Sequence, residues 1–354
     1  MSVGLSVVMP VYNEAPHLPA TIDALAEAIG RSDFDAELVL VDDGSTDRSA
    51  EVVQETVDER LRLRVVSQLN SGRFDARRAG LQAASADWVL FLDGRVRLEP
   101  DALVFVFDRL RAGERVWNGH VDIDTHGNPY GAFWDVLVGL AWRDYLDDPR
   151  TTSFDSESFD RYPKGTTCFL APRELLLEAV SAFRSYYLNR RFVSDDTALI
   201  RWLAERERIH ISPAFACRYA PRPTLNGFLR QAVYRGSTFL DGHGRRESRF
   251  FLGAVAFYPV SAAIAFAAVR RPAIVPGLAA TGALAAGAVA VAAKRTRFES
   301  ISFALLAPVY ALAHGVGMWR GLLMMVDKRA RAAAEAPTSA DAHHERPAAS
   351  DARR

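Results

Sequence analysis

The sequence predicts an α/β domain with a mostly parallel β-sheet, followed by a region of about three apolar helices. Up to about residue 113, short apolar runs alternate with stretches of helical spacing. These runs are apolar throughout, which is typical of parallel strands covered by helices on both faces. Beyond residue 249 come three apolar stretches of about 20 residues or more, the length of a helix that crosses a membrane.

The chain therefore divides into three parts. We expect a folded domain over residues 1–245, a membrane region over 250–326 and a disordered tail over 328–354 that is rich in Ala, Arg, Asp and Pro. Basic residues flank every apolar stretch, so the positive-inside rule gives no orientation from the sequence. Two of the stretches can form a hairpin while the third lies in the membrane interface.

The individual elements follow from composition and spacing. Short β-branched or apolar runs predict strands at residues 5–11, 37–41, 63–67, 88–92 and 116–124, and a further apolar run covers residues 168–171. Helical spacing predicts helices at residues 17–29, 49–59, 74–84 and 193–206. The last of these helices opens with Ser194, Asp195, Asp196 and Thr197, residue types that are favoured at helix N-termini.

Polar side chains follow three of the predicted strands, at the point where each strand ends. Asn13 and Glu14 follow the first strand, Asp42 and Asp43 the second, and Asp93 the fourth. Ligands of parallel sheets bind where the strands end. Three such clusters in register predict a binding site at this edge.

The composition excludes some classes of protein. Lys+Arg and Asp+Glu both number 43, so the net charge is zero, which argues against a nucleic-acid-binding protein. Cys168 and Cys217 form no CxxC pair, which argues against a structural zinc site or a disulfide framework. The N-terminus lacks the basic start and cleavage site of a signal peptide, so we expect the folded domain to stay in the cytoplasm.

Several motifs resemble those of the family 2 glycosyltransferases, whose catalytic domain has the nucleotide-sugar-binding GT-A fold. The matching segments are VMPVYNE at 8–14, VLVDDGSTD at 39–47, NSGRFDARRAG at 70–80, FLDGR at 91–95, KGTTC at 164–168, SDDT at 194–197 and RQAVYRG at 230–236. The layout is similar to that of membrane-attached members that build exopolysaccharide or lipid-linked sugars. The resemblance covers about residues 5–240.

The resemblance implies which residues bind the nucleotide-sugar donor. Asp42 would accept a hydrogen bond from the nucleobase, and a uridine nucleotide is favoured. Arg77 reaches a phosphate, or is a solvated helix residue. The whole predicted donor site consists of Pro10, Tyr12, Glu14, Asp42, Asp43, Arg77, Asp93 and Arg95.

The segment at 93–95 departs from the family pattern. The family usually has Asp-x-Asp here, and the two carboxylates hold Mg²⁺ or Mn²⁺ on the donor diphosphate. Arg95 stands in place of the second acid. Either Asp93 still holds the divalent cation, with Arg95 turned aside and Asp122 or Asp124 helping, or Arg95 itself neutralises the diphosphate. We favour a cation on Asp93.

The resemblance also implies the catalytic and acceptor residues. Asp195 and Asp196 match the acidic pair of the family, and Asp196 is the expected general base. Alternatively, the two carboxylates only stabilise the helix through their negative charge at its N-terminus. The predicted acceptor or phosphate residues are Arg230, Gln231 and Arg235, which could equally anchor an interfacial helix.

Histidines suggest two further features. The alternation of His120, Asp122, Asp124 and His126 resembles metal-ligand spacing, but we favour a solvated strand face. His314 lies inside an apolar stretch, where it is either functional or a helix contact.

The predicted function is transfer of a sugar, with inversion, from a nucleotide sugar to a lipid-linked or growing polysaccharide acceptor of the cell envelope. The enzyme would be a multi-pass protein of the cell membrane. One alternative is a polyprenyl-phosphate sugar synthase, whose acceptor phosphate needs little deprotonation. Another is a catalytically silent partner in a glycan-assembly complex, because the metal motif is broken.

Overall fold

The computed structural model describes residues 3–57, 61–246 and 248–335. In this part of the chain one mixed sheet has the order β3-β2-β1-β4-β8-β6-β9-β5, and β7 also pairs with β9. The strands are β1 Val3–Val11, β2 Phe34–Asp42, β3 Arg62–Ser67, β4 Trp88–Leu92, β5 Val96–Leu98, β6 Val116–Ile123, β7 Thr152–Phe154, β8 Cys168–Pro172 and β9 Ile209–Tyr219.

The first half of the sheet is parallel, as the sequence predicts, and the second half is not. The β3-β2-β1-β4 strands run parallel, whereas β8 is antiparallel to both β4 and β6. The parallel strands β1, β2 and β4 therefore end at the same edge. The strands β5, β7, β8 and β9 were not expected; β5 and β7 are only three residues long each.

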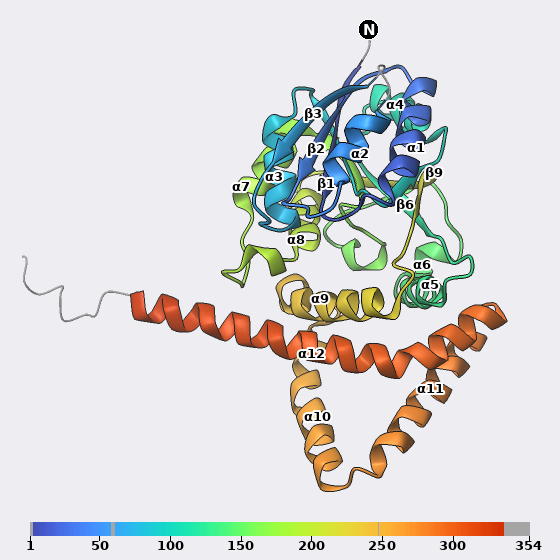
Figure 1. Ribbon diagram of the computed structural model, residues 1–354, viewed down its shortest axis with the longest axis vertical. Helices are drawn as coiled ribbons and strands as arrows, with labels where there is room; N and C mark the ends of the chain where they lie inside the picture. Colours follow the sequence, from blue (N-terminus) through green and yellow to red (C-terminus); the bar gives the residue numbers. More distant parts are fainter. Residues whose placement is uncertain (1–2, 58–60, 247, 336–354) are drawn as a thin grey trace, which may run out of the picture.

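Helices cover both faces of the sheet (Figure 1). The helices of the folded domain are α1 Leu18–Arg31, α2 Ser49–Thr56, α3 Arg73–Ala83, α4 Ala102–Arg111, α5 Pro129–Ala141, α6 Arg143–Leu146, α7 Arg173–Ala182, α8 Asp195–Ala204 and α9 Leu225–His243. Two short 3₁₀ helices are η1 Phe159–Arg161 and η2 Arg190–Phe192.

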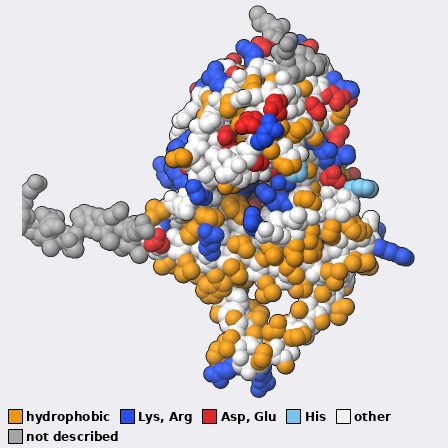
Figure 2. Space-filling model, in the orientation of Figure 1, with side chains coloured by type: hydrophobic (Ala, Val, Ile, Leu, Met, Phe, Trp, Pro, Cys, Tyr) orange, Lys and Arg blue, Asp and Glu red, His pale blue; other side chains and the backbone are white. Residues whose placement is uncertain are grey.

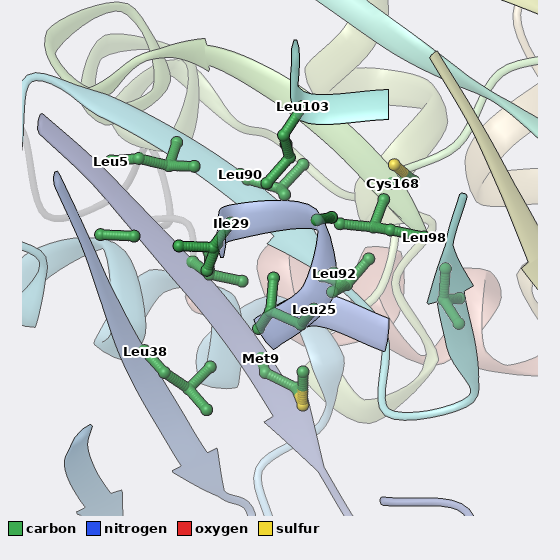
Figure 3. Close-up of a cluster of buried hydrophobic side chains, with 14 of the residues drawn as sticks. Leu5, Met9, Leu25, Ile29, Leu38, Leu90, Leu92, Leu98, Leu103 and Cys168 are labelled. Atoms are coloured by element: carbon green, nitrogen blue, oxygen red, sulfur yellow. The ribbon is translucent and has the colours of Figure 1, made fainter. Parts of the chain in front are cut away.

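Alternating side chains of the central strands fill two separate cores. Leu5, Val7 and Met9 of β1 point to the face covered by α1 and α4, and Figure 3 shows part of this core around Leu25 and Ile29. Val8 points to the opposite face, where α3, α7 and α8 pack. This period of two is what a strand buried on both faces requires.

Three further helices are long and apolar enough to cross a membrane. They are α10 Phe251–Arg270, α11 Ile274–Ala292 and α12 Arg297–Glu335, and apolar side chains gather over them in Figure 2. Figure 1 shows α10 and α11 as a V that projects away from the sheet, while α12 runs alongside α9 beneath the folded domain. With 39 residues, α12 is about 58 Å long, roughly twice the hydrocarbon thickness.

Among the boundaries that differ from the sequence prediction, two lie beside residues outside the described part. The predicted tail begins at residue 328, but α12 continues through Glu335, and residues 336–354 lie outside the described part. The predicted helix at 49–59 ends at Thr56, and residues 58–60 also lie outside the described part.

The helices α9 and α12 cross in backbone contact. A Cβ added at Gly236 would lie 2.1 Å from the His314 carbonyl oxygen, and one at Gly317 would lie 2.2 Å from that of Val233. Any side chain at either position would force the helices apart. Small residues allow such close approach between helices in membranes. The crossing fixes the folded domain to its apolar helices.

Candidate functional site

The loops after β1 and β2 form one side of the site. Asn13 has a φ of 56°, a left-handed conformation that asparagine tolerates. Its Oδ1 accepts hydrogen bonds from the backbone N–H of Thr46 at 2.7 Å and of Asp47 at 3.3 Å. Pro10 lies near the end of β1, and the Tyr12 side chain is exposed. The two loops are thus fixed to each other beside an open surface.

The two predicted nucleoside aspartates have different environments. Asp43 is buried, and its carboxylate accepts hydrogen bonds from Gln68 Nε2, Ser71 N and Gly72 N at 2.7–2.9 Å. It therefore holds the β3–α3 loop in place. Asp42 is partly exposed, and only its Oδ1 is bonded within the described residues, to Ser45 N at 2.9 Å. Asp42 is the better candidate for contact with a base.

Arg77 joins two of the predicted motifs. Its guanidinium is 4% exposed; Nη2 donates to Asp93 Oδ1 at 2.7 Å, and Nη1 donates to Asp195 Oδ2. Burial alone would lower the pKa of Arg77, but the two carboxylates outweigh burial and raise it. The interpretation of Arg77 as a solvated helix residue is wrong, because α3 turns it into the protein. A phosphate contact from Arg77 stays a prediction.

Asp196 is the freer of the two acids on α8. Its Oδ1 accepts hydrogen bonds from Thr197 N at 2.7 Å and from Ser194 Oγ at 3.2 Å. Burial would raise the pKa of Asp196, but Arg73, the Thr197 N–H and Arg77 hold it below its usual range. The carboxylate is therefore ionised at neutral pH, as a general base must be.

Arg95 pairs with Glu14. Its Nε lies 2.6 Å from Glu14 Oε2, and the two side chains are 10% and 13% exposed. Arg222 Nη2 is a second neighbour of Glu14, at 3.5 Å. Burial raises the pKa of Glu14 even with these cations nearby. Of the two alternatives for Arg95, this geometry fits the one in which it is turned aside from the metal position.

The proposed helper acids have other partners. Asp122 Oδ1 lies 3.3 Å from His120 Nε2, and Asp124 Oδ2 lies 3.2 Å from an Arg97 nitrogen. Across residues 3–57, 61–246 and 248–335, no group of three or more His, Cys, Asp or Glu side chains could hold a metal ion. The solvated-face interpretation is correct for the exposed Asp122 but wrong for His120, which is buried against the Tyr145 hydroxyl at 3.0 Å.

The membrane side of the site is lined by α9. Arg235 lies over the Trp134 ring at 4.5 Å and contributes to the field at Asp196, whereas Arg230 is exposed. Gln231 Oε1 is buried without a hydrogen-bond partner among the described residues. The structure thus brings Arg235, but not Arg230, to the predicted base.

Sequence reasoning missed two basic residues. Arg73 lies over the Tyr234 ring at 4.9 Å and acts on Asp196. Lys164 Nζ donates to the Tyr162 carbonyl at 2.8 Å, and burial lowers the pKa of this amine to about 7. Both residues lie inside segments that match the family, and this match could have identified them as candidate site residues.

Comparisons with known proteins identify the family of the folded domain. Residues 6–176 match the family model described as Glycosyl transferase family 2. An uncharacterized glycosyltransferase, EpsJ of Bacillus subtilis, is 36% identical over 90 residues, 25% of each chain. The undecaprenyl-phosphate 4-deoxy-4-formamido-L-arabinose transferase of Pseudomonas aeruginosa is 36% identical over 142 residues, 39% of this chain and 41% of that one. The chain thus spans between a quarter and about two fifths of these curated relatives.

A solved structure shares the fold over most of its length. The mannosyltransferase PcManGT from Pyrobaculum calidifontis, in complex with GDP-Man and Mn²⁺, aligns with a TM-score of 0.54 at 20% identity. The alignment covers 89% of this chain and 86% of that one. This likeness confirms the GT-A fold and extends beyond the residues that the family model matches.

Proposed function

We propose, from the premise that this chain carries a glycosyltransferase family 2 domain, that it transfers a sugar from a nucleotide sugar to a lipid-linked acceptor at the membrane surface. One observation carries the proposal. Asp196, whose pKa is lowered by Arg73 and Arg77 of α3 and by Arg235 of α9, follows directly after Asp195, which Arg77 links to Asp93. An acceptor held by the membrane helices would meet the donor at this carboxylate.

The chemistry that this arrangement supports is direct displacement. Asp42 would accept a hydrogen bond from the base and thereby orient the donor. Asp196 would take the proton from an acceptor hydroxyl as that oxygen attacks the anomeric carbon. Attack from the side opposite the leaving nucleotide inverts the configuration. Asp195 is neutralised by Arg77, so we assign it to positioning.

The acceptor decides between two versions of this function. A hydroxyl on a lipid-linked or growing glycan needs a base, whereas the phosphate of a polyprenyl lipid does not. The Pseudomonas aeruginosa relative is named for undecaprenyl-phosphate, which favours the second version. The ionised Asp196, whose carboxylate makes no ion pair with the residues that the structure describes, favours the first, which we adopt.

Asp93 is suited to hold a divalent cation together with the donor. Arg77 occupies its Oδ1, which leaves Oδ2 without a hydrogen bond to the described residues. Mg²⁺ is commonly bound by one or two carboxylates plus substrate phosphates. Because Arg95 pairs with Glu14, its guanidinium does not neutralise Oδ2 of Asp93. A bound Mg²⁺ or Mn²⁺ would neutralise charge on the leaving diphosphate.

Nucleotide binding tests the donor half of the proposal. Detergent-purified protein is titrated with UDP and GDP by calorimetry, and then incubated with a panel of nucleotide sugars and membrane lipid extract. We expect UDP to bind best. Asp42→Ala should weaken its binding by about 1–3 kcal/mol, the cost of one hydrogen bond lost in a partly buried site. Ser45→Ala, which keeps the Asp42 carboxylate, is the matched control.

The outcomes of this experiment separate the possibilities. Product mass would identify the sugar and the acceptor together. Unaltered UDP affinity in Asp42→Ala would remove this residue from the pocket. Nucleotide binding without any transfer or donor hydrolysis would support a catalytically silent partner instead.

The arrangement of α10–α12 supports a cytoplasmic folded domain. Arg295, just after α11, lies 2.9 Å from Asp135 of α5, so the chain returns to the side of the folded domain. The turn after α10, with Arg270 and Arg271, lies at the far end of the V (Figure 1). Most flanking basic residues therefore lie on the near side: Arg245, Arg246, Arg249, Lys294, Arg295, Arg297 and Lys328. Under the positive-inside rule this excess of basic residues on the near side supports a cytoplasmic folded domain.

Cysteine labelling checks this topology. Pro272→Cys at the far turn and Thr296→Cys at the near turn are treated in sealed cells with a membrane-impermeant maleimide. Cys168 and Cys217 are buried and should give little background. We expect Pro272→Cys to be labelled from outside and Thr296→Cys to be labelled only after lysis. Equal protection of both would mean that the hairpin does not cross the membrane.

A further inference from the structure

A buried aspartate on α9 binds the start of the catalytic helix. The Asp241 residue is 5% exposed, and its Oδ2 accepts a hydrogen bond from Ser194 N at 2.8 Å. Its Oδ1 accepts from Ser185 Oγ at 2.8 Å and from Tyr186 N at 2.6 Å. One carboxylate thus joins α9 to two separate points of the chain before α8. Hydrogen bonds to an ionised acceptor are roughly twice as strong as neutral ones.

Ser194 passes this contact on to the proposed base. It is the N-cap residue of α8, directly before Asp195 and Asp196. Its hydroxyl donates to Asp196 Oδ1 at 3.2 Å. On the other side, a Cβ added at Gly242 would lie 2.7 Å from Ser194 Oγ, so the α9 backbone packs directly against this hydroxyl. The position of Asp196 Oδ1 therefore depends on where α9 lies.

The helix α12 fixes the same segment from below. Lys328 Nζ donates to the Ser185 carbonyl, and Tyr187 OH donates to the Ser237 carbonyl of α9 at 2.8 Å. A Cβ added at Gly321 of α12 would lie 2.7 Å from both the Ser237 oxygen and the Tyr187 hydroxyl. Ser185, which Asp241 binds through its hydroxyl, is thus also bound through its carbonyl by the longest apolar helix.

We propose that Asp241 is a positioning residue that, through Ser194, holds Asp196 in place and ties it to the helices α9 and α12. This rests on the proposed role of Asp196 as general base. Asp241 is 5% exposed and accepts three hydrogen bonds from Ser185, Tyr186 and Ser194, so we assign it no contact with a substrate. Its effect is on geometry: a misplacement of about 1 Å can cost about 100-fold in rate.

The test uses Asp241→Asn in the full-length protein in detergent. An amide cannot accept from both Ser194 N and Tyr186 N without turning its NH₂ group toward one of them. We expect kcat to fall about 10- to 100-fold with the KM for the nucleotide sugar unchanged within about twofold. Ser185→Ala is the matched control, because it removes one hydrogen bond of Asp241 but keeps the bond to Ser194; it should retain kcat within about twofold.

Hydrogen exchange gives a readout that does not need activity. The Ser194 amide should exchange faster in Asp241→Asn than in the wild type or in Ser185→Ala, since its acceptor is lost. If the wild type transfers no sugar, the proposed function fails, and exchange at Ser194 alone decides whether Asp241 holds this residue. If the wild type is active but Asp241→Asn keeps its kcat, only the positioning role is overturned.

Two further outcomes are informative. An equal loss of kcat in Ser185→Ala, or a rise in donor KM along with the fall in kcat, would indicate general loosening and overturn the proposal. If Asp241→Asn does not fold, Ser194→Ala replaces it, because it deletes only the hydroxyl that reaches Asp196. A wild-type kcat in Ser194→Ala would then overturn the proposal that Asp241 positions Asp196 through Ser194.

Discussion

Asp196→Asn abolishes sugar transfer and leaves nucleotide affinity nearly unchanged. The amide cannot take a proton from the acceptor, and the loss of a general base typically costs about 10²–10⁴-fold. Donor binding should survive, because the Arg77 bridge between Asp93 and Asp195 does not include this side chain. Single-turnover transfer and UDP calorimetry measure the two effects separately.

The pH dependence of the wild type provides a second readout of the same residue. Because nearby cations and the Thr197 N–H hold the pKa of Asp196 below its usual range, the base is already ionised well below neutrality. We expect kcat/KM to be flat through neutral pH and to fall only in acid. Asp195→Asn is the companion variant: full turnover in Asp196→Asn with a loss in Asp195→Asn would move the base by one residue. Normal turnover in both would favour a phosphate acceptor.

Asp93→Ala eliminates transfer, as does an excess of chelator, and Mn²⁺ or Mg²⁺ restores activity only to the wild type. The reason is electrostatic, since Asp93 would otherwise face an anionic diphosphate with one oxygen uncompensated. Removing one electrostatic partner of a developing anion costs about 10²–10³-fold in rate. The measurement is initial rate against free metal concentration. A fully active wild type in excess chelator would contradict a cation on Asp93.

The companion variant in this motif is Arg95→Asp. This substitution recreates the Asp-x-Asp spacing of the family, but the structure predicts a loss of stability. The substitution removes the partner of Glu14 and sets a second acid near it, and breaking a buried ion pair costs about 3–5 kcal/mol. Because Arg222 also lies near Glu14, we expect the lower end of this range.

Denaturant unfolding measures this cost. The double variant Glu14→Gln with Arg95→Met replaces both charges and should recover most of the stability that Arg95→Met alone loses, because no buried charge is then left unpaired. Additive losses in the double variant would show that the two residues do not stabilise each other. If Arg95→Asp is instead stable and more active than the wild type, the new carboxylate acts as the second metal ligand that the family pattern has at this position.

The sequence predicted those parts of the fold that depend on local pattern. The strand at 88–92 has the predicted bounds, because a fully buried run of Trp, Val, Leu and Phe has few alternatives. The helices α5 and α9 were not predicted. Their burial comes from packing against α12, which no window of local sequence contains.

The candidate site also depends on contacts between residues far apart in the sequence. The motifs identified Asp93, Asp195 and Arg77 as polar residues of interest, but not their mutual contact. Arg77 meets Asp195 118 positions later in the chain. Whether an arginine contacts a phosphate, solvent or two carboxylates depends on such long-range pairing. Arg95 and Glu14 are a second case, because a motif is compared position by position and this pair joins two motifs.

The crossing of α9 and α12 has a practical consequence for anyone who wishes to obtain the folded domain by itself. A chain cut after α9 would keep every residue assigned to donor and catalysis, yet it would expose the part of α9 around Gly236 and the aromatic side chains of α5 that now lie against α12. We expect such a shortened protein to aggregate and to have a low turnover rate. Adding α12 back as a separate peptide, without the α10–α11 hairpin, would be the more promising route to a tractable enzyme.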